Sequence, residues 1–136
     1  MDPSLEDADY RRLLQFRTGL RRFLRWSEKQ AVKAGLTAAQ HQLLLAIRGH
    51  DGDLGPTIGD VAGYLLLRHH SAVGLVDRAV KGGWIERQED AEDRRIVRLR
   101  LTPQGERTLQ QLSAAHFEEI KRLAPRVRDL TQGLEP

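Results

Sequence analysis

The segment Leu75–Arg95 constrains the fold more than any other stretch, because three kinds of local pattern follow one another within it. An apolar helical pattern stops at Gly82 and Gly83, a short strand pattern follows, and six of the seven residues in 89–95 are charged. Charge at that density is excluded from a protein core. The charged run is therefore expected at an exposed turn, either as plain solvated surface or held out toward a partner.

The residues on both sides of the charged run predict a β-hairpin. In residues 96–101, apolar and basic side chains alternate as in a strand with one buried face. A second strand pattern begins at Trp84 and precedes the charged run. Residues 88–95 are therefore predicted to form the tip of a two-stranded ribbon.

Five helical patterns surround the hairpin, each with apolar residues at three- and four-residue spacing. The expected helices cover residues 4–34, 37–49, 57–66, 68–81 and 102–123. Pro125 is expected to end or kink the last one. A buried stripe is expected on the first helix, formed by Leu13, Phe16, Leu20, Phe23 and Leu24, and on the last, through Leu109, Leu112 and Phe117.

Three threonines mark where helices should begin. Thr37 and Thr57 are each followed, three residues later, by a side chain that completes a capping box, Gln40 and Asp60 respectively. Thr102 precedes a proline, which is well tolerated at the first position of a helix.

Length and composition limit the class of protein. A chain of 136 residues with 40% hydrophobic content buries one modest core, so residues 1–136 are expected to form a single domain. The absence of cysteine excludes disulfides and thiol-based sensing. No apolar run resembles a signal peptide or a membrane span, which predicts a soluble, cytoplasmic protein without a membrane partner.

The charge of the chain is small but uneven. The formal net charge is +3, yet residues 11–33 carry eight Lys and Arg against the single Glu28. This basic helix permits a polyanionic partner. The alternative is a solvated face whose charge is offset by acids of the last helix such as Glu118 and Glu119.

Three helices followed by a hairpin are the order of a winged helix-turn-helix, in which one short helix supports a second that enters the major groove of DNA. We therefore expect a mainly α fold with a small antiparallel β-hairpin as the wing. An arginine-bearing tip is suited to reach a phosphate backbone or a narrow minor groove. The alternative is a solvated turn in which Glu89, Asp90, Glu92 and Asp93 cancel Arg94 and Arg95.

Residues 75–105 resemble the MarR family of transcriptional regulators in register. The shared features are Leu-Val-Asp-Arg at 75–78, a following glycine, Asp-x-Arg at 93–95, alternating apolar residues, and Leu-Thr-x-x-Gly at 101–105. The match extends more weakly upstream through "LTAAQHQLL" and "TIGDVAGYL". The resemblance thus covers about residues 36–110.

This resemblance implies a homodimer that places two winged helices on successive major grooves of a palindromic operator in double-stranded DNA. Residues 36–102 would form the DNA-binding lobe, and residues 4–35 and 103–132 the helical dimerisation region. It also implies a repressor whose binding a small ligand relieves. Transcription regulation is therefore the expected function, with no enzymatic activity, cofactor or metal.

By position, the resemblance assigns DNA contacts to both ends of the lobe. The start of the recognition helix would contribute Arg68, His69, His70 and Ser71, and its outward face Arg78. In the wing, Asp93 would orient Arg95 for the minor groove, with Arg94 as a phosphate contact. The family's ligand site, between the dimerisation helices and the lobe, suggests that Arg22 or Arg25 with Trp26 holds an anionic aromatic effector.

The chain departs from the family pattern in three places. Arg68 and His69 replace the usual Ser-Pro start of the recognition helix, so the cap of that helix must come from elsewhere or be weaker. Gly74 replaces a longer polar side chain that often reads a base. Beyond Pro125 the chain is short, so we expect the first helix and the end of the fifth to carry the dimer interface.

Other functions remain open on the sequence alone. His69 and His70 lack the spacing and the third ligand of a metal site, and no nucleotide-binding or nucleophile motif is present. One of the two histidines could instead pack against the supporting helix and cap it. A nonspecific or architectural DNA-binding protein and a winged helix that binds proteins are the alternative functions.

Overall fold

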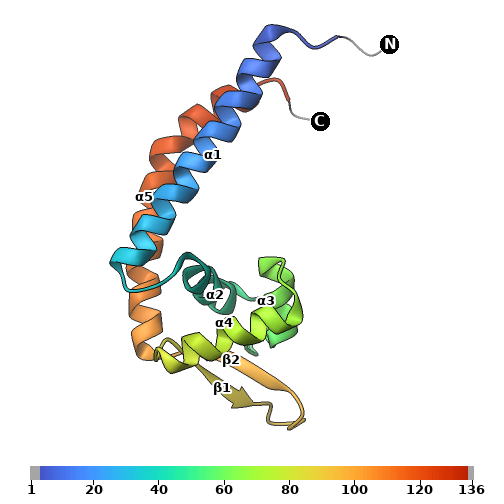
Figure 1. Ribbon diagram of the computed structural model, residues 1–136, viewed down its shortest axis with the longest axis vertical. Helices are drawn as coiled ribbons and strands as arrows, with labels where there is room; N and C mark the ends of the chain where they lie inside the picture. Colours follow the sequence, from blue (N-terminus) through green and yellow to red (C-terminus); the bar gives the residue numbers. More distant parts are fainter. Residues whose placement is uncertain (1–3, 135–136) are drawn as a thin grey trace.

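The computed structural model describes residues 4–134, which form two parts of different shape (Figure 1). Two long helices, α1 (Asp7–Lys33) and α5 (Pro103–Thr131), lie side by side and form what we call the stem. The chain between them forms the winged lobe, with α2 (Ala38–Gly49), α3 (Ile58–Leu65), α4 (His69–Lys81), β1 (Ile85–Glu89) and β2 (Val97–Leu101). The predicted mainly helical fold with one antiparallel hairpin is confirmed.

Three threonines begin helices as the sequence predicted. Thr37 Oγ1 accepts a hydrogen bond from the backbone N–H of Gln40 at 3.1 Å, and Gln40 Oε1 accepts one from the N–H of Thr37 at 3.0 Å. Thr57 and Asp60 make the same reciprocal pair at the start of α3. Thr102 Oγ1 accepts a hydrogen bond from the backbone N–H of Gly105, the third residue of α5, at 3.1 Å. Each cap satisfies a backbone donor that has no partner within its helix.

The hydrophobic core lies inside the winged lobe and at its junction with the stem. Every helix and strand of the lobe contributes a large, fully buried side chain, and together these are Leu43, Leu44, Val61, Val76, Ile85 and Leu99. Leu109 and Leu112 extend this core into the first half of α5. Burying a side chain of this size contributes about 1.5–3 kcal/mol, so these residues are a main source of the lobe's stability.

Gly105 allows α5 to pack directly against the start of the hairpin. A Cβ atom at this position would lie 2.1 Å from the carbonyl oxygen of Trp84, which is closer than any side chain tolerates. Thr102 donates its backbone N–H to the same oxygen at 3.1 Å and its hydroxyl to the oxygen of Gly83 at 2.6 Å. The glycine of the Leu-Thr-x-x-Gly motif is therefore required by close approach of two backbone segments.

The last helix is longer than the sequence predicted. An end near Leu123 is wrong, because α5 continues through Pro125. The proline removes one N–H donor, but it is exposed, so water reaches the carbonyl group left without a partner. Arg12 of α1 holds the far end, since its Nη2 donates to the carbonyl oxygens of Leu130 at 2.9 Å and Gln132 at 2.7 Å. The two stem helices are therefore joined near the termini as well as at the lobe.

The apolar stripe of α1 is not buried, contrary to the prediction. Its most exposed members are Leu13, Phe16, Leu20 and Leu24, with 57%, 41%, 43% and 55% of their surface accessible. The helix instead buries a neighbouring face of small residues, Ser27 and Ala31. Phe117 of α5, also expected inside, is 63% exposed. The stem thus has an apolar face that the chain itself does not cover.

None of the helices between residues 4 and 134 is both long enough and apolar enough to cross a membrane.

Candidate nucleic-acid interface

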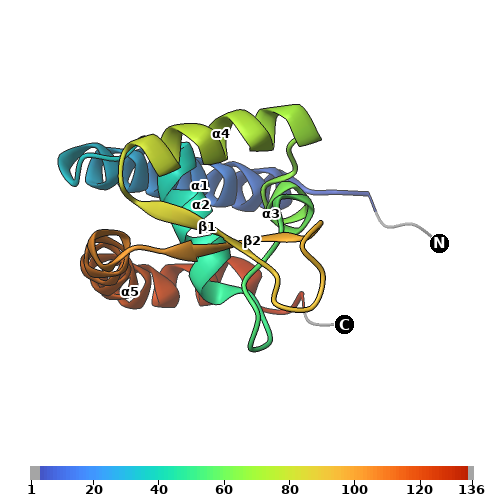
Figure 2. The ribbon, with the colours of Figure 1, turned by 90° about the horizontal axis from the view of Figure 1, so that it is seen from below.

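Helix α4 presents its first turn to solvent at the end of the lobe away from the stem. Seen from below, α4 runs along one side of the hairpin (Figure 2). The four side chains predicted to contact DNA here, Arg68, His69, His70 and Ser71, are all exposed. Arg68 occupies the N-cap position without a side-chain hydrogen bond, as the departure from the Ser-Pro pattern predicted. The first N–H groups of α4 therefore lack a side-chain acceptor within the described chain.

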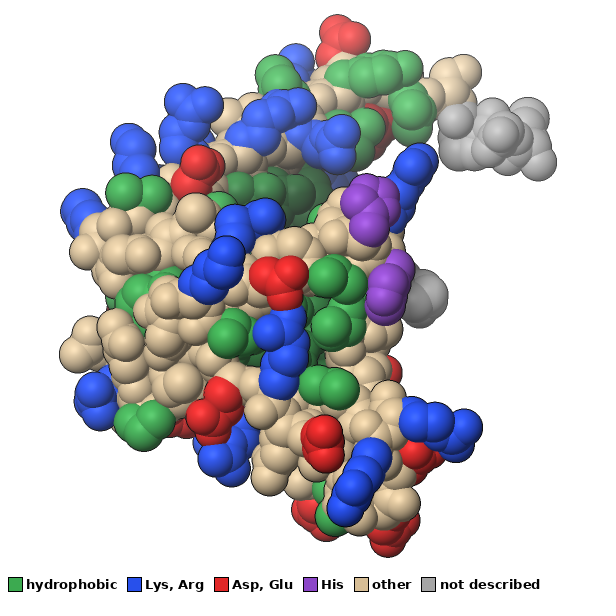
Figure 3. Space-filling view, turned by 60° about the horizontal axis from the view of Figure 1, so that its bottom comes forward, with side chains coloured by type: hydrophobic (Ala, Val, Ile, Leu, Met, Phe, Trp, Pro, Cys, Tyr) green, Lys and Arg blue, Asp and Glu red, His purple; other side chains and the backbone are tan. Residues whose placement is uncertain are grey.

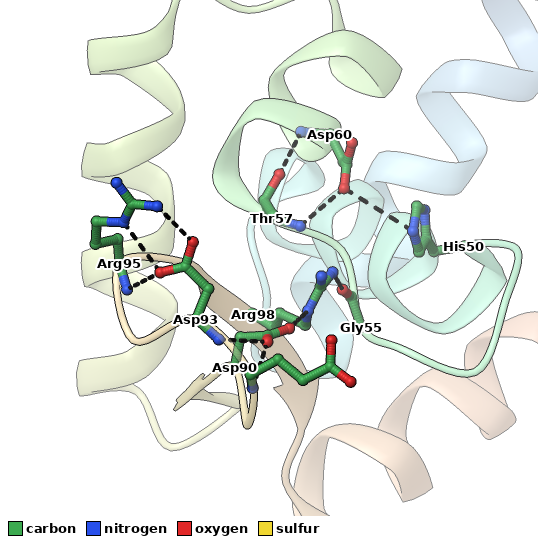
Figure 4. A network of polar contacts seen from close by, with 9 residues as sticks. His50, Gly55, Thr57, Asp60, Asp90, Asp93, Arg95 and Arg98 are labelled. Atoms are coloured by element: carbon green, nitrogen blue, oxygen red, sulfur yellow. Dashed lines mark hydrogen bonds and ion pairs between the residues drawn. The ribbon is translucent and has the colours of Figure 1, made fainter.

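Asp93 holds Arg95 at the tip of the wing (Figure 4). Its Oδ1 accepts from the backbone N–H and the Nε of Arg95 at 3.0 and 3.1 Å, and its Oδ2 accepts from Nη2 at 2.9 Å. The hydrogen bond from the Arg95 side chain lowers the pKa of Asp93 below its usual value, so the carboxyl group is charged at neutral pH. The Arg95 side chain is nevertheless 89% exposed. A guanidinium group that is both oriented and accessible is prepared for an anionic partner.

Asp90 organises the backbone of the tip, which sequence reasoning missed. Its Oδ1 accepts from the N–H groups of Glu92 and Asp93 at 2.9 and 3.0 Å, and its Oδ2 accepts from Arg98 Nε at 2.6 Å. Arg98 in turn donates to the carbonyl oxygen of Gly55 at 3.0 Å (Figure 4). The hydrogen bond from Arg98 is the main cause that lowers the pKa of Asp90. Asp90 therefore fixes the loop that carries the Asp93–Arg95 pair.

The loop before α3 approaches the wing at Gly55. A Cβ atom there would lie 2.3 Å from the carbonyl oxygen of Leu99, and Leu99 donates its N–H to Pro56 at 2.9 Å. At the beginning of the loop, where α2 ends, His50 Nδ1 lies 2.7 Å from the hydroxyl oxygen of Tyr64 in α3. The loop is thus attached both to β2 and to α3. Nothing in the sequence marks Gly55 as a partner of Arg98, because the two lie 43 positions apart.

The outward face of α4 contains one paired and two unpaired charges. Asp77 forms an ion pair with Arg87 of β1, which ties the helix to the hairpin. Arg78 and Lys81 are exposed and form no ion pair with any residue in 4–134. Arg94 at the tip is exposed as well. Figure 3 shows this face, with His side chains at its right edge and Lys and Arg side chains of the hairpin tip below them.

Of the suggested effector residues, Trp26 lies at the junction of the stem and the lobe, beside His116, whose ring faces that of His41 in α2. Trp26 is half-buried, with its ring centroid 4.8 Å from that of His116, while Arg22 and Arg25 are exposed. No hydrogen bond or ion pair joins these two arginines to another residue in 4–134. The structure thus brings Trp26 into an aromatic cluster and leaves both guanidinium groups free.

Two histidines meet beside Trp26. His116 Nδ1 lies 2.7 Å from the carbonyl oxygen of Leu112, which only accepts, so Nδ1 is the protonated nitrogen. Nε2 of the same ring lies 2.7 Å from the hydroxyl oxygen of Ser27. The buried ring of His41 lies 4.9 Å from that of His116. Burial lowers the pKa of His41, and the neighbouring His116 adds to the effect.

The basic charge of α1 is not offset as the alternative interpretation supposed. Glu118 and Glu119 pair within α5, with Lys121 and Arg122. No α1 side chain takes part in an ion pair between described residues. Figure 3 shows Lys and Arg side chains gathered over α1 in the upper part of the view.

In residues 4–134, no three His, Asp or Glu side chains come close enough together to hold a metal ion.

Comparisons with known proteins identify the matching region. The model of the MarR family matches residues 34–96. The uncharacterised HTH-type transcriptional regulator YsmB of Bacillus subtilis is 37% identical over 70 residues, which are 52% of this chain. The matched region spans 47%, about half, of that relative. The strongest sequence similarity therefore falls on the winged lobe.

Solved structures match over most of the chain. An S. aureus MepR variant bound to an oligodeoxyribonucleotide superposes with a TM-score of 0.68 at 21% identity, covering 82% of this chain and 80% of its own. CouR from Rhodococcus jostii RHA1 bound to p-coumaroyl-CoA gives a TM-score of 0.68 at 25% identity, covering 90% and 88%. The similarity includes the stem as well as the lobe.

Proposed function

This chain belongs to the MarR family through its winged lobe, and from that premise we propose that it is a sequence-specific DNA-binding regulator of transcription. The observation that carries the proposal is the wing tip, where Asp93 holds an 89% exposed Arg95 in one orientation. A solvated turn would not need a carboxylate to position its guanidinium group. We assign Arg95 to the minor groove and Arg94 to a neighbouring phosphate.

Helix α4 supplies the second half of the proposed interface. Its uncapped first turn offers backbone N–H groups to a phosphate, with the positive end of the helix dipole behind them. His69, His70 and Ser71 are exposed there and are assigned to base edges or phosphates of the major groove. Because Asp77 is paired with Arg87, helix and wing are held as one unit that contacts two adjacent grooves. The S. aureus MepR variant, which has this fold, is bound to an oligodeoxyribonucleotide.

We propose that the functional unit is a homodimer joined through the stem. The apolar stripe of α1 and Phe117 of α5 remain exposed in the single chain and require a cover. A second copy covers them with the same stripe, as in a two-fold interface. Two lobes related in this way would bind a palindromic operator, with half-sites about one helical turn apart.

The proposed regulation is repression relieved by an anionic aromatic ligand at the stem–lobe junction. Trp26 offers an aromatic surface there, and Arg22 and Arg25 are free to bind an anion. CouR, at 25% identity, is bound to p-coumaroyl-CoA, an aromatic compound of this kind. The two lobes of the dimer can be spaced to fit DNA or not to fit it. A ligand that binds one of these spacings more tightly than the other changes the affinity for DNA, and the size of the change is set by the difference between the ligand's two affinities.

The test begins with selection of duplexes from the host genome, followed by competition binding at fixed salt. The proposal expects the selected operator to bind at least ~1,000-fold more tightly than random duplex. Arg95→Ala is expected to weaken operator binding by about 10-fold or more, because it removes a minor-groove contact. Arg48→Ala, which removes an exposed arginine of α2 outside the proposed DNA and dimer contacts, is the matched control and should leave binding unchanged.

The alternative functions give different results in the same assay. An architectural binder would show only the salt-dependent phosphate contribution and no preference for the selected operator. A protein-interaction module would bind neither duplex, and Arg95→Ala would have no effect. Either result would reject the proposed function.

A further inference from the structure

The middle of α4's outward face contains a glycine that a neighbouring arginine covers. Gly74 lies one turn after His70 and Ser71 and one turn before Arg78. A Cβ atom at Gly74 would meet Arg78 Nη1 at 3.2 Å and Cζ at 3.9 Å. The guanidinium group therefore lies back along the helix, in the space that a side chain at position 74 would occupy. This direction is the normal one, since helical side chains lean toward the N-terminus.

The guanidinium group of Arg78 donates no hydrogen bond to any residue that the structure describes. Asp77, its neighbour in sequence, is engaged by Arg87 of β1. Arg78 is exposed and forms no ion pair or side-chain hydrogen bond with any residue in 4–134. The wing arginines differ in this respect, because Arg95 and Arg98 are both held by carboxylates. The guanidinium group of Arg78, at the centre of the exposed face of α4, is therefore available to a molecule that binds this face.

We propose that Gly74 and Arg78 together form the base-reading element at the centre of α4, and that Arg78 selects guanine. This inference rests on the proposed function, because it requires α4 to lie in the major groove. Arginine donates two parallel hydrogen bonds to O6 and N7 of guanine, a pair that the other three bases do not present there. The absent side chain at position 74 lets the base edge approach the helix while the guanidinium group spans the gap. Gly74 is thus a positioning residue and Arg78 the contacting one.

A phosphate contact by Arg78 is the competing interpretation, and the two differ in measurable ways. Loss of a guanine contact relaxes the preference at one base pair in each half-site and leaves the other positions unchanged. Loss of a phosphate contact weakens all duplexes uniformly and lowers the slope of log affinity against log salt by about 0.9 per site.

The experiment uses the full-length protein, the selected operator and a panel of operators with single base-pair changes in both half-sites. The preference at every position is measured by fluorescence anisotropy at two or more salt concentrations. For the parent protein we expect one position in each half-site at which guanine is preferred by on the order of 10- to 100-fold. Arg78→Met keeps the apolar stem, removes the donors and should abolish that preference. Lys81→Met, which removes another exposed cation of α4, should retain it.

Gly74→Ala tests the positioning role separately. The added Cβ would displace the guanidinium group, so the guanine preference should fall several-fold. Alanine is the better helix former, so the melting temperature should stay equal or rise. A variant that loses guanine preference but keeps or raises its melting temperature has not lost its fold.

Three results would overturn the inference. They are a uniform loss of affinity with a shallower salt dependence in Arg78→Met, unchanged preferences in Arg78→Met, and an unchanged guanine preference in Gly74→Ala. If the parent protein itself shows no preference for any duplex, the proposed function fails and the inference fails with it. If the parent shows an operator preference but Arg78→Met reads the same bases, only the inference fails.

Discussion

The winged lobe and the stem differ in how they cover their apolar and charged side chains. Each helix and strand of the lobe buries a large apolar side chain, and the hairpin's basic residues Arg87, Arg95, Arg98 and Arg100 are each paired with a carboxylate. In the stem, α1 exposes its leucines and forms no ion pair within residues 4–134, although residues 11–33 contain eight Lys and Arg. The lobe forms its hydrophobic core within the single chain, whereas the stem leaves an apolar face that the single chain does not cover.

The largest effect is expected from the core of the lobe. Leu43→Ala leaves a cavity at a fully buried site of α2 and should lower the free energy of unfolding by about 3 kcal/mol. Leu45→Ala, on the same helix but 47% exposed, is the matched control and should cost far less. Chemical denaturation measures both. Equal effects would show that burial within the single chain does not govern the lobe's stability.

The stem should respond through association. Leu24→Glu places a charge on the exposed stripe, 55% accessible in the single chain, and should weaken dimerisation on the order of 100-fold, since burying an unpaired charge is costly. Sedimentation at several concentrations measures this, and circular dichroism should show an unchanged helical content. Leu54→Glu, an equally exposed leucine of the lobe, should leave association unaffected. If the parent protein is a monomer, the exposed stripe is not a dimer interface and the contrast between lobe and stem is wrong.

A smaller effect is expected where the strands of the wing meet its tip. Arg98→Met removes the pair with Asp90 and the bond to Gly55, and should cost about 1–2 kcal/mol of stability. The N–H groups of Glu92 and Asp93 should then lose protection from hydrogen exchange, because Asp90 no longer holds them. Arg100→Met breaks an exposed pair on the same strand and should not change exchange at the tip. If the N–H groups of Glu92 and Asp93 are equally protected in Arg98→Met, then Arg98 does not help to position Arg95.

The smallest effect is a pH dependence at the junction of the two parts. Because burial lowers the pKa of His41 from 6.5, the unfolded chain binds a proton more readily than the folded one. The contribution of His41 to stability is therefore complete above pH 6.5 and is lost as the pH falls through the lowered pKa. Unfolding free energies measured between pH 7.5 and 5 should decline less steeply in His41→Gln. An identical slope would assign the pH dependence to other groups.

The features that the sequence predicted correctly depend on residues close together in the chain. Thr37, Thr57 and Thr102 cap helices through backbone N–H groups three residues further along the chain. Such contacts need only a local pattern to be recognised. The same holds for the alternation that predicted the second strand.

The features that sequence reasoning missed depend on distant or absent partners. The Arg98–Gly55 bond joins residues that no periodicity relates, and Arg12 supports the end of α5 across 118 positions. The path of α5 through Pro125 follows from that tertiary support rather than from local preference. The expectation that the apolar stripe of α1 is buried within the chain was wrong, because an amphipathic pattern shows that a face is apolar but not which molecule covers it.

The backbone contact at Gly105 has a mechanical consequence. With no side chain between α5 and Trp84, the helix and the hairpin turn together, and the 29 residues of α5 form a rigid arm about 43 Å long. A tilt of ~10° at the far end of that arm swings the wing through roughly 7 Å, about two base-pair steps of a duplex. If the chain binds DNA as proposed, a bend at the paired ends of α1 and α5 would move the wing relative to the duplex without any rearrangement inside the lobe.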